Sequence, residues 1–229
     1  MVSNLVIKLG GHLISTQRGI NLNLLKAYAS LLSSLYSGGR WCIIIGGGEE
    51  ARRYIQAARS LGLSESLCDS IAVKITRIHA RILAALIGEK AYQEIPESLE
   101  EIIEYSSLGR IVVAGGLQPA QSTTAVAALA AEALKAEKLI IATDVDGVYT
   151  SDPKKDPDAK LLEKVTLSKL EEILSESPHI AGEYKLIDML ALKILRRSKI
   201  RTIVLNGNKP ENLEKAIRGE KIGTLITPE

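Results

Sequence analysis

Residues 41–54, WCIIIGGGEEARRY, constrain the fold of this chain more than any other stretch. The run 41–45 is apolar and rich in isoleucine, which is typical of a strand buried on both faces of a sheet. Three glycines at 46–48 follow, and a helical pattern begins at Glu49. Such a turn lets backbone N–H groups approach a ligand, and the helix N-terminus attracts an anion. The stretch predicts a phosphate or carboxylate site, unless the glycines serve only close packing of helix on strand.

Strands and helices alternate along the whole chain. Strands are expected at 4–9, 41–45, 110–114, 139–143, 201–205 and 223–227. Helices are expected at 21–36, 49–61, 64–87, 98–107, 123–135, 168–175, 185–198 and 210–218. Segments 148–150 and 160–163 flank a turn-rich stretch and predict a small hairpin or flap. This order predicts one domain over residues 1–229, a three-layer α/β/α sandwich with a mostly parallel central sheet.

The helix expected at 64–87 has an apolar stripe at helical spacing. Its members are Leu67, Ile71, Ile75, Ile78, Ile82 and Leu86. The pattern alone leaves open whether this stripe belongs to the core or to a subunit interface.

Composition excludes several classes of protein. A net charge of only +2 gives no support for nucleic acid or a membrane surface as a partner. No apolar run approaches the roughly 20 residues of a membrane span, and the first residues lack a signal-peptide profile. Cys42 and Cys68 are expected to be buried thiols of a reducing compartment, and neither has metal-ligand spacing. We therefore expect a cytoplasmic protein.

Four of the expected strands end in glycines or polar residues. These strand ends lie within 8–12, 46–52, 115–124 and 143–152. Ligands bind outside the carboxyl ends of the strands in open parallel sheets. Four such ends at one edge predict a groove large enough for two ligands.

Several common chemistries lack their motif. The phosphate loop GxxxxGK[ST] is absent. Gly46, Gly48 and Ala51 fit the dinucleotide fingerprint, but Asp69, near the distance of its ribose-binding acid, falls in a helical pattern instead of at a strand end. Only His12 among the histidines is near the edge and no G-x-S-x-G turn exists, which disfavours a serine hydrolase.

Phosphoryl transfer fits the remaining residues best, because its transition state requires mainly positioning and positive charge. Lys8 is an unusual polar residue in an apolar strand, because it stands between Ile7 and Leu9. Arg52 and Arg53 lie in the first turn of a helix, where at least one is expected to add a cation. The glycine turns offer backbone donors. Asp144, Asp146 and Asp152 are placed to orient the lysines or to reach Mg²⁺ through water.

Four motifs together resemble the amino acid kinase superfamily and, within it, the archaeal branch of uridylate (UMP) kinases. They are KLGG at 8–11, GGG at 46–48 with Ala51 and Arg52, GGLQP and QST at 115–123, and TDVDGVY at 143–149. The resemblance covers essentially the whole chain. It implies transfer of the γ-phosphoryl group of ATP to UMP, giving ADP and UDP for pyrimidine nucleotide synthesis. It further implies Mg²⁺ with ATP and a cytoplasmic homo-hexamer, a trimer of dimers.

The resemblance also implies residue roles. Catalytic roles fall on Lys8, Asp146 and Lys193. ATP binding falls on Gly11, His12, Gly48, Arg52, Thr143, Tyr149 and Asp152. UMP binding falls on Gly47, Asp69, Leu117, Gln118, Pro119, Ala120, Gln121, Ser122 and Thr123. The part of the chain up to about 135 would form the phosphate-acceptor side and the part from about 136 the ATP side, with no metal site built from protein residues alone.

Four positions depart from the family pattern. His12 stands where a small hydroxyl residue is common, Ala120 replaces a usual Gly, Asp144 a usual Asn, and Met189 a usual Pro. None of these departures removes a central residue.

Other interpretations remain open on the sequence. Residues 121–123 are also good caps for the helix that follows. A kinase of the same fold acting on a carboxylate or carbamate would not need the segment with GLQP and QST at 116–123. A non-catalytic nucleotide-binding sensor or storage protein would not need Lys8. A dinucleotide oxidoreductase would have to bind NAD.

Overall fold

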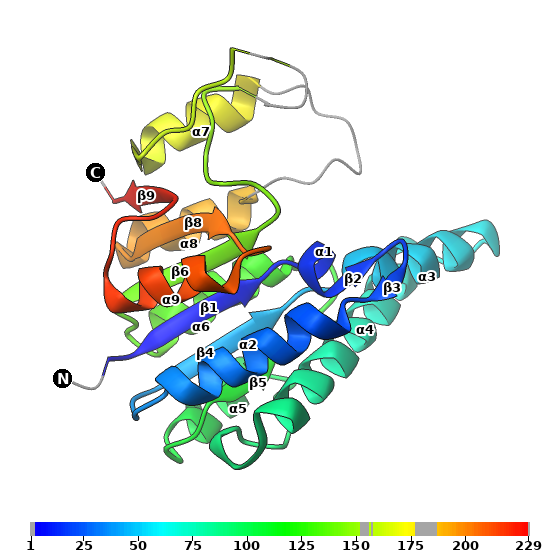
Figure 1. Cartoon of the computed structure of the whole chain (residues 1–229). Helices are drawn as coiled ribbons and strands as arrows, with labels where there is room; N and C mark the ends of the chain where they lie inside the picture. The colour runs from blue at the N-terminus through cyan, green and yellow to red at the C-terminus, as the bar shows by residue number, and fades with distance from the viewer. Residues whose placement is uncertain (1–2, 152–155, 157, 177–186, 229) are drawn as a thin grey trace.

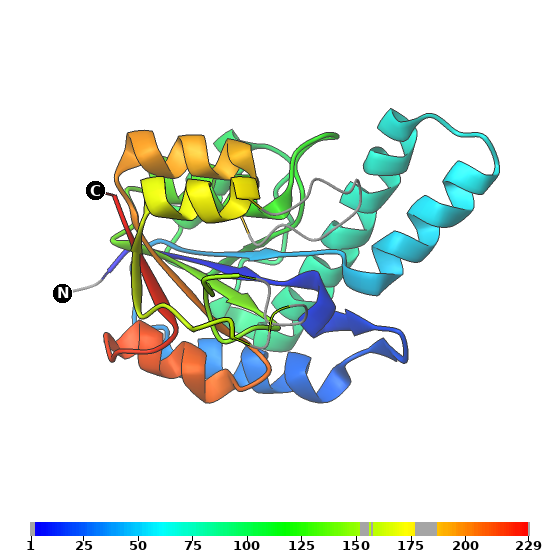
Figure 2. The ribbon, with the colours of Figure 1, turned by 90° about the horizontal axis from the view of Figure 1, so that it is seen from above.

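The computed structural model describes residues 3–151, 156, 158–176 and 187–228. A seven-stranded sheet lies between two layers of helices (Figures 1 and 2). Its strand order is β5-β4-β1-β6-β8-β9-β7, and the first five strands in this order are parallel. β9 is antiparallel to β8, and β7 is parallel to β9. The expected three-layer α/β/α sandwich with a mostly parallel sheet is confirmed.

The strands and helices have the following bounds. The strands are β1 Leu5–Leu9, β2 Ser15–Thr16, β3 Gly19–Ile20, β4 Trp41–Ile45, β5 Val112–Ala114, β6 Lys138–Thr143, β7 Lys164–Thr166, β8 Arg201–Asn206 and β9 Thr224–Thr227. The helices are α1 Gly11–Ile14, α2 Leu22–Leu35, α3 Gly48–Ser60, α4 Glu65–Ile87, η1 Gly88–Lys90, α5 Leu99–Ser106, α6 Thr123–Ala133, α7 Leu167–Glu176, α8 Met189–Ser198 and α9 Pro210–Arg218.

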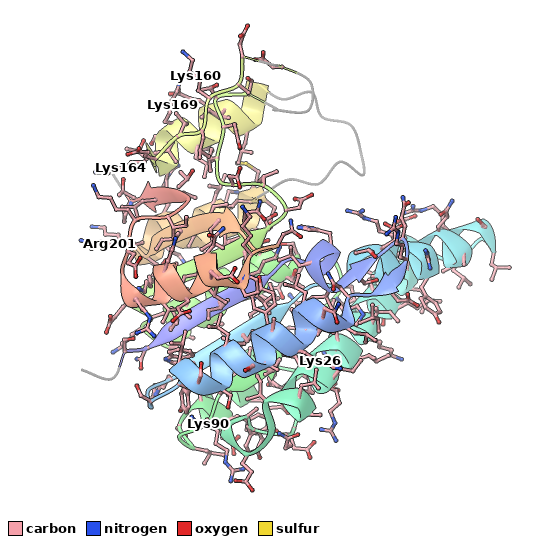
Figure 3. All side chains as sticks on the ribbon, in the orientation of Figure 1. Lys26, Lys90, Lys160, Lys164, Lys169 and Arg201 are labelled. Atoms are coloured by element: carbon pink, nitrogen blue, oxygen red, sulfur yellow. The ribbon has the colours of Figure 1, made fainter. Side chains whose placement is uncertain are left out.

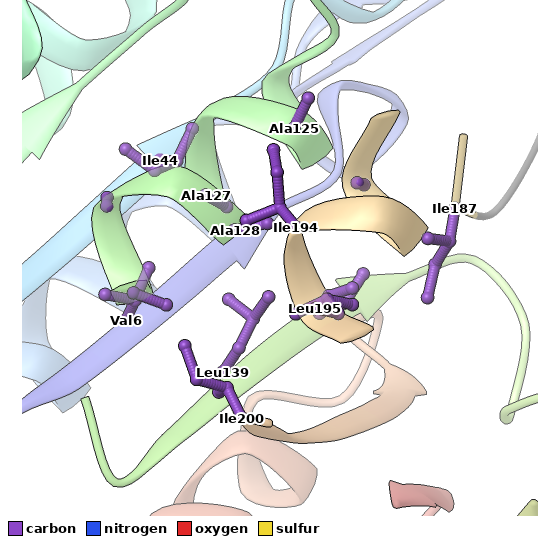
Figure 4. Close-up of a cluster of buried hydrophobic side chains, with 14 of the residues drawn as sticks. Val6, Ile44, Ala125, Ala127, Ala128, Leu139, Ile187, Ile194, Leu195 and Ile200 are labelled. Carbon is purple, nitrogen blue, oxygen red and sulfur yellow. The ribbon is translucent and has the colours of Figure 1, made fainter. Parts of the chain in front are cut away.

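Each face of the sheet has its own apolar core, because alternate side chains of a strand point to opposite faces. Leu5, Ile7 and Leu9 of β1 pack in the core that contains residues of α2, α4 and α9. Val6 packs in the other core, with residues of α6 and α8 (Figure 4). The chain has no phenylalanine, and α6 fills its part of this core largely with alanine.

Side-chain caps explain why several helix starts were predictable. Asn21, Ser64, Ser98 and Ser122 each accept a hydrogen bond from an N–H group three residues further on. Such a cap satisfies one of the backbone donors that a helix leaves free at its start. The sequence therefore predicted these boundaries to within about a residue.

One helix start was predicted too early. The helix expected from Lys185 begins only at Met189, because the Asp188 side chain caps α8 by accepting from the N–H groups of Leu190 and Ala191 at 2.9 and 3.0 Å. Residues 185 and 186 lie outside the described part of the chain.

Short strands escaped prediction. The hairpin of β2 and β3 and the strand β7 have two or three residues each, too few for a periodic pattern. The expected flap is present as a single antiparallel bridge between Tyr149 and Leu161, flanked by backbone bonds from Thr150 to Lys160 and from Leu162 to Val148.

The apolar stripe of α4 lies largely outside the core, and Ile82 is the member that packs against it. Leu67, Ile78 and Leu86 are exposed, and the other three members are half-buried. The buried face of α4 consists instead mainly of small or polar residues such as Cys68, Thr76, His79, Ala80 and Ala84. α3 and α4 extend together past the sheet (Figures 1 and 2), so the sheet cannot cover the outer part of this helix pair.

Charged side chains are spread over the outside of the molecule. Lys160, Lys164 and Lys169 lie near β7 and α7, whereas Lys26 and Lys90 lie far from them, beside α2 and η1 (Figure 3). None of the helices that the structure describes is long and apolar enough to cross a membrane.

Candidate active site

Five parallel strands end at one edge of the sheet. The order β5-β4-β1-β6-β8 and its register place the segments 115–116, 46–48, 10–12, 143–147 and 206–208 next to one another in that sequence. The prediction that four polar strand ends share an edge is confirmed. The end of β8, with Asn206, is a fifth that sequence reasoning missed.

The two central glycine turns touch each other through their backbones. A Cβ atom on Gly11 would lie 2.0 Å from the nitrogen of Gly48, and one on Gly48 would lie 2.2 Å from the carbonyl oxygen of Gly11. Gly48 also has a positive φ of 60°. Only glycine fits this contact, so the GGG turn does serve close packing, against the Gly10-Gly11 turn of β1.

A cavity of about 400 Å³ lies beside this contact. It is lined by the start of α3, by α4 and by residues 116–123, which we call the cavity loop. Gly47 has no side chain to cap α3, and Gly47, Gly48 and Ala51 at the start of this helix line the cavity, whereas the N–H of Glu50 donates to the Ser15 hydroxyl at 2.9 Å. The arrangement suits a ligand that carries an anionic group.

Side chains of α4 hold the cavity loop and the GGG turn. The Asp69 carboxylate accepts from the N–H of Ala120 at 2.9 Å, and the Thr76 hydroxyl accepts from the N–H of Gly116 at 2.6 Å. Nδ1 of the buried His79 lies 3.1 Å from the carbonyl oxygen of Gly46. α4 therefore connects two strand ends that are distant in sequence.

Ser122 has two roles in the structure. Its side-chain oxygen caps α6 by accepting from the N–H of Ala125 at 2.9 Å, as the cap interpretation predicted. Its hydroxyl also donates to the carboxylate of Asp188, which caps α8. One serine–aspartate pair thus joins the starts of two helices at the rim of the cavity.

Lys8 lies in the middle of the sheet. Its neighbours in register are Ile44 of β4 and Ile141 of β6, and the residue is only 2% exposed. Burying a lysine is costly unless its charge is used or paired. The prediction that Lys8 is an unusual polar residue of a buried strand is confirmed.

A polar cluster lies on the other side of β1, at the ends of β6 and β8. Nε2 of His12 lies 3.4 Å from both the hydroxyl of Thr143 and a carboxylate oxygen of Asp144. Asn206 donates to Asp146 at 2.9 Å, and the Tyr149 hydroxyl donates to the same carboxylate at 3.4 Å. Burial, together with the nearby Asp146, raises the pKa of Tyr149, which therefore stays a neutral donor.

A second cavity, of about 510 Å³, lies between the flap, β7 and α7. It is larger, but no residue with a predicted role lines it, and β7 runs opposite to the five parallel strands. We take the edge of the parallel strands as the site.

Residues 4–206 match the Amino acid kinase family. The chain belongs to this family. A uridylate kinase of Methanothermobacter thermautotrophicus is 44% identical over 98% of this chain and 99% of its own length, and one of Methanobrevibacter smithii is 41% identical over 97% and 98%. The crystal structure of uridylate kinase from Archaeoglobus fulgidus is 40% identical, with a TM-score of 0.86 over 98% of this chain and all of that one.

Seven of the nine residues expected to bind the phosphate acceptor in this amino acid kinase line the 400 Å³ cavity. They are Gly47, Asp69, Gln118, Ala120, Gln121, Ser122 and Thr123. The other two do not line it: Leu117 packs against the core beneath α6, and Pro119 is exposed.

The predicted arginine and lysine side chains on α3 and α8 do not line the cavity. Arg52 is exposed and pairs with Glu49 at 3.4 Å, and Arg53 donates to the carbonyl of Gln17. Neither lines the cavity, contrary to the expectation for at least one of them, because Arg52 is exposed and Arg53 is bound to the turn between β2 and β3. Lys193 is exposed on α8. Asp152 lies outside the described residues.

Two further residues of the site carried no motif signal. Asn206 reaches Asp146 from the end of β8. Although it belongs to no known motif, the pair Asn206-Gly207 at the end of a buried strand could have indicated a fifth polar strand end. Asp188 could be found only from the structure, because its partner Ser122 is distant in sequence. Within the described ranges no three His, Cys, Asp or Glu side chains gather as a metal-binding cluster.

Proposed function

We propose that this chain is a uridylate kinase, which transfers the γ-phosphoryl group of ATP to UMP and releases ADP and UDP. The observation that carries this proposal is the gathering of the cavity loop, Asp69 and the α3 N-terminus around one cavity at the ends of β4 and β5, beside the strand that carries Lys8. The named uridylate kinases, 40–44% identical over nearly the whole chain, support it.

The order of the strands supports a division of labour along the groove. UMP would occupy the cavity at the ends of β4 and β5, with Asp69 accepting from its ribose hydroxyls and the cavity loop surrounding its base and phosphate. ATP would lie at the ends of β6 and β8, against Gly11, His12, Thr143 and Tyr149. The acceptor half of the chain would thus run to about residue 135 and the ATP half from about 136.

Lys8 would act at the junction of the two nucleotides. Its ammonium group would stabilise the charge that spreads over the transferred phosphoryl group, in a site from which protein side chains exclude water. Asp146, held by Asn206 and Tyr149, would orient the cationic groups, and Lys193 would add a second charge from α8. Gly48 and Arg52 would contact nucleotide phosphates.

Mg²⁺ would enter this site with ATP. The carboxylates Asp144 and Asp146 are oxygen ligands of the kind that Mg²⁺ prefers, and an ion that arrives with ATP would be held chiefly by phosphate oxygens and water. The ion would neutralise phosphate charge during transfer.

A hexamer built as a trimer of dimers is the proposed assembly. The exposed apolar side chains on α3 and α4 and at the end of α3, which include Tyr54, Leu61, Leu67 and Ile78, support a subunit interface on this helix pair. Light scattering coupled to size-exclusion chromatography should give a mass near that of six chains. The mass of a single chain would contradict the assembly. We also propose a cytoplasmic location, which cell fractionation tests.

An ADP-release assay with ATP, Mg²⁺ and a panel of acceptors tests the function. UMP should give the highest kcat/KM, with CMP, GMP and acetylglutamate well below it. No rate above background with UMP would refute the proposal, and turnover with acetylglutamate alone would favour a carboxylate kinase. ATP binding without transfer to any acceptor would favour a sensor.

Lys8→Met keeps the volume and packing of the buried side chain but removes the charge. Turnover should fall by a factor on the order of 10²–10³, as for other lost stabilisers of developing charge, whereas UMP affinity should stay within a few fold. Lys138→Met is the matched control: Lys138 is also a strand lysine, but it donates to carbonyls of α9. If Lys8→Met retained full turnover, Lys8 would have no catalytic role.

A further inference from the structure

Arg77 on α4 binds the backbone at the beginning of the cavity loop, although it does not itself line the cavity. Its Nε donates to the carbonyl of Gly116 at 3.1 Å, and Nη2 donates to the carbonyl of Leu117 at 3.0 Å. The side chain is only 19% exposed. One rigid, planar fork therefore holds two successive carbonyl groups, which fixes the direction in which the chain leaves β5.

The guanidinium group is itself held from the other side. Nη1 lies 2.6 Å from a carboxylate oxygen of Glu97, and Nη2 also lies 3.4 Å from the carbonyl oxygen of that residue. The N–H of Glu97 donates to Glu101 at 2.6 Å, in the first turn of α5, which Ser98 caps. The fork is thus fixed between α4 and the start of α5.

The neighbouring contacts make Arg77 part of a larger attachment. Thr76 accepts from the N–H of Gly116, so both backbone groups of that buried glycine bind adjacent residues of α4. Asp69, two turns earlier on α4, accepts from the N–H of Ala120. The loop is attached to one helix at its beginning and at its middle.

We propose that Arg77 is a positioning residue for the phosphate acceptor. It holds the cavity loop in the conformation that binds the nucleoside monophosphate, so that binding does not have to order the loop. This inference rests on the proposed function, since it takes the cavity as the acceptor site. Arg77 has no contact with the ends of β6 and β8, and its loss should leave ATP binding unchanged.

The kinetic test compares three variants on α4. Arg77→Ala should raise the KM for UMP about tenfold or more, because two hydrogen bonds from a charged donor are lost, while the KM for ATP stays within about twofold. Arg77→Lys should give an intermediate KM for UMP, because an ammonium group cannot serve both carbonyls as a fork does.

Arg81→Ala is the matched control. Arg81 lies one turn later on α4, donates to the carbonyl of Gln93 and lies 3.8 Å from Glu94, but it has no contact with the cavity loop. Its loss should leave both KM values unchanged. Equal rises in KM for UMP in Arg77→Ala and Arg81→Ala would overturn the proposal, as would an unchanged KM in Arg77→Ala.

Hydrogen exchange separates this inference from the proposed function. The backbone N–H groups of residues 116–118 and 120–123 should exchange faster in Arg77→Ala than in Arg81→Ala, whatever the acceptor is. If the wild-type protein did not phosphorylate UMP, the function would fail but this comparison would still decide the role of Arg77. Unchanged exchange in the loop would overturn that role.

Glu97→Gln extends the test to the support of the fork, and Arg77→Lys takes the place of Arg77→Ala in this comparison if Arg77→Ala does not fold. Glu97→Gln should raise the KM for UMP less than Arg77→Ala does, and it should have no further effect in the double variant. A full additive effect would show that Glu97 acts independently of Arg77.

Discussion

Ala120 adopts the left-handed backbone conformation, with φ at 59°, in the middle of the cavity loop. The conformation costs a residue with a Cβ atom about 1–2 kcal/mol. The N–H of Ala120 is held there by Asp69, so the contact with α4 maintains the strain. The sequence indicated this position, since Ala120 departs from the glycine that the family pattern has, but the sign of φ came from the structure.

Ala120→Gly should stabilise the protein by up to about 1 kcal/mol, because the strain removed exceeds the added flexibility of the unfolded chain. Urea unfolding measures the change. Lys199→Gly is a suitable control, since Lys199 is also left-handed, with φ at 53°, at the end of α8 and away from the cavity. A variant Ala120→Gly less stable than the parent would contradict this account.

His12 and Asp144 both depart from the family pattern, and the structure places them in contact at 3.4 Å. Sequence reasoning treated them as separate departures, because no local pattern connects the end of β1 with the end of β6. The two departures therefore meet in the fold, with a ring nitrogen of His12 beside the additional carboxylate of Asp144.

His12→Ser should raise the KM for ATP severalfold, because Asp144 loses one partner and its negative charge faces the ATP phosphates. The double variant with Asp144→Asn should recover most of this loss. A cycle of the four proteins should give a coupling energy of at least about 0.5 kcal/mol. Strictly additive effects would mean that the two residues act separately.

α6 and α8 are joined where both begin, through Ser122 and Asp188.

Local signals predicted most elements well: apolar runs located the longer strands, and capping residues located several helix starts. They failed where the deciding contact is distant, as at Asp188, and where an element is too short for a period, as in β7. The role of the α4 stripe stayed open on the sequence for a related reason, since periodicity identifies an apolar face but not what covers it.

Asp188→Ala should destabilise the protein by about 1–3 kcal/mol, because it removes both the cap of α8 and the acceptor for the Ser122 hydroxyl. Asp188→Asn retains a capping oxygen and should cost less. Thermal or urea unfolding measures both. A change below about 0.5 kcal/mol in Asp188→Ala would show that the junction of the helices contributes little.

The order of the strands places β1, with Lys8, between the cavity at β4 and β5 and the polar cluster at β6 and β8. The sequence predicted that these strand ends share an edge, because the alternation of strands and helices implies a mostly parallel sheet. It could not give their order along the edge, or the reversal at β9, because pairing between distant strands leaves no local pattern.

Two nucleotides bound end to end along this edge are the central claim. An adenosine and a uridine joined by five phosphates should therefore bind one per chain in calorimetry, on the order of 10³-fold more tightly than ATP alone, and both ATP and UMP should compete with it. Affinity no greater than that of ATP, with competition by ATP only, would contradict the claim.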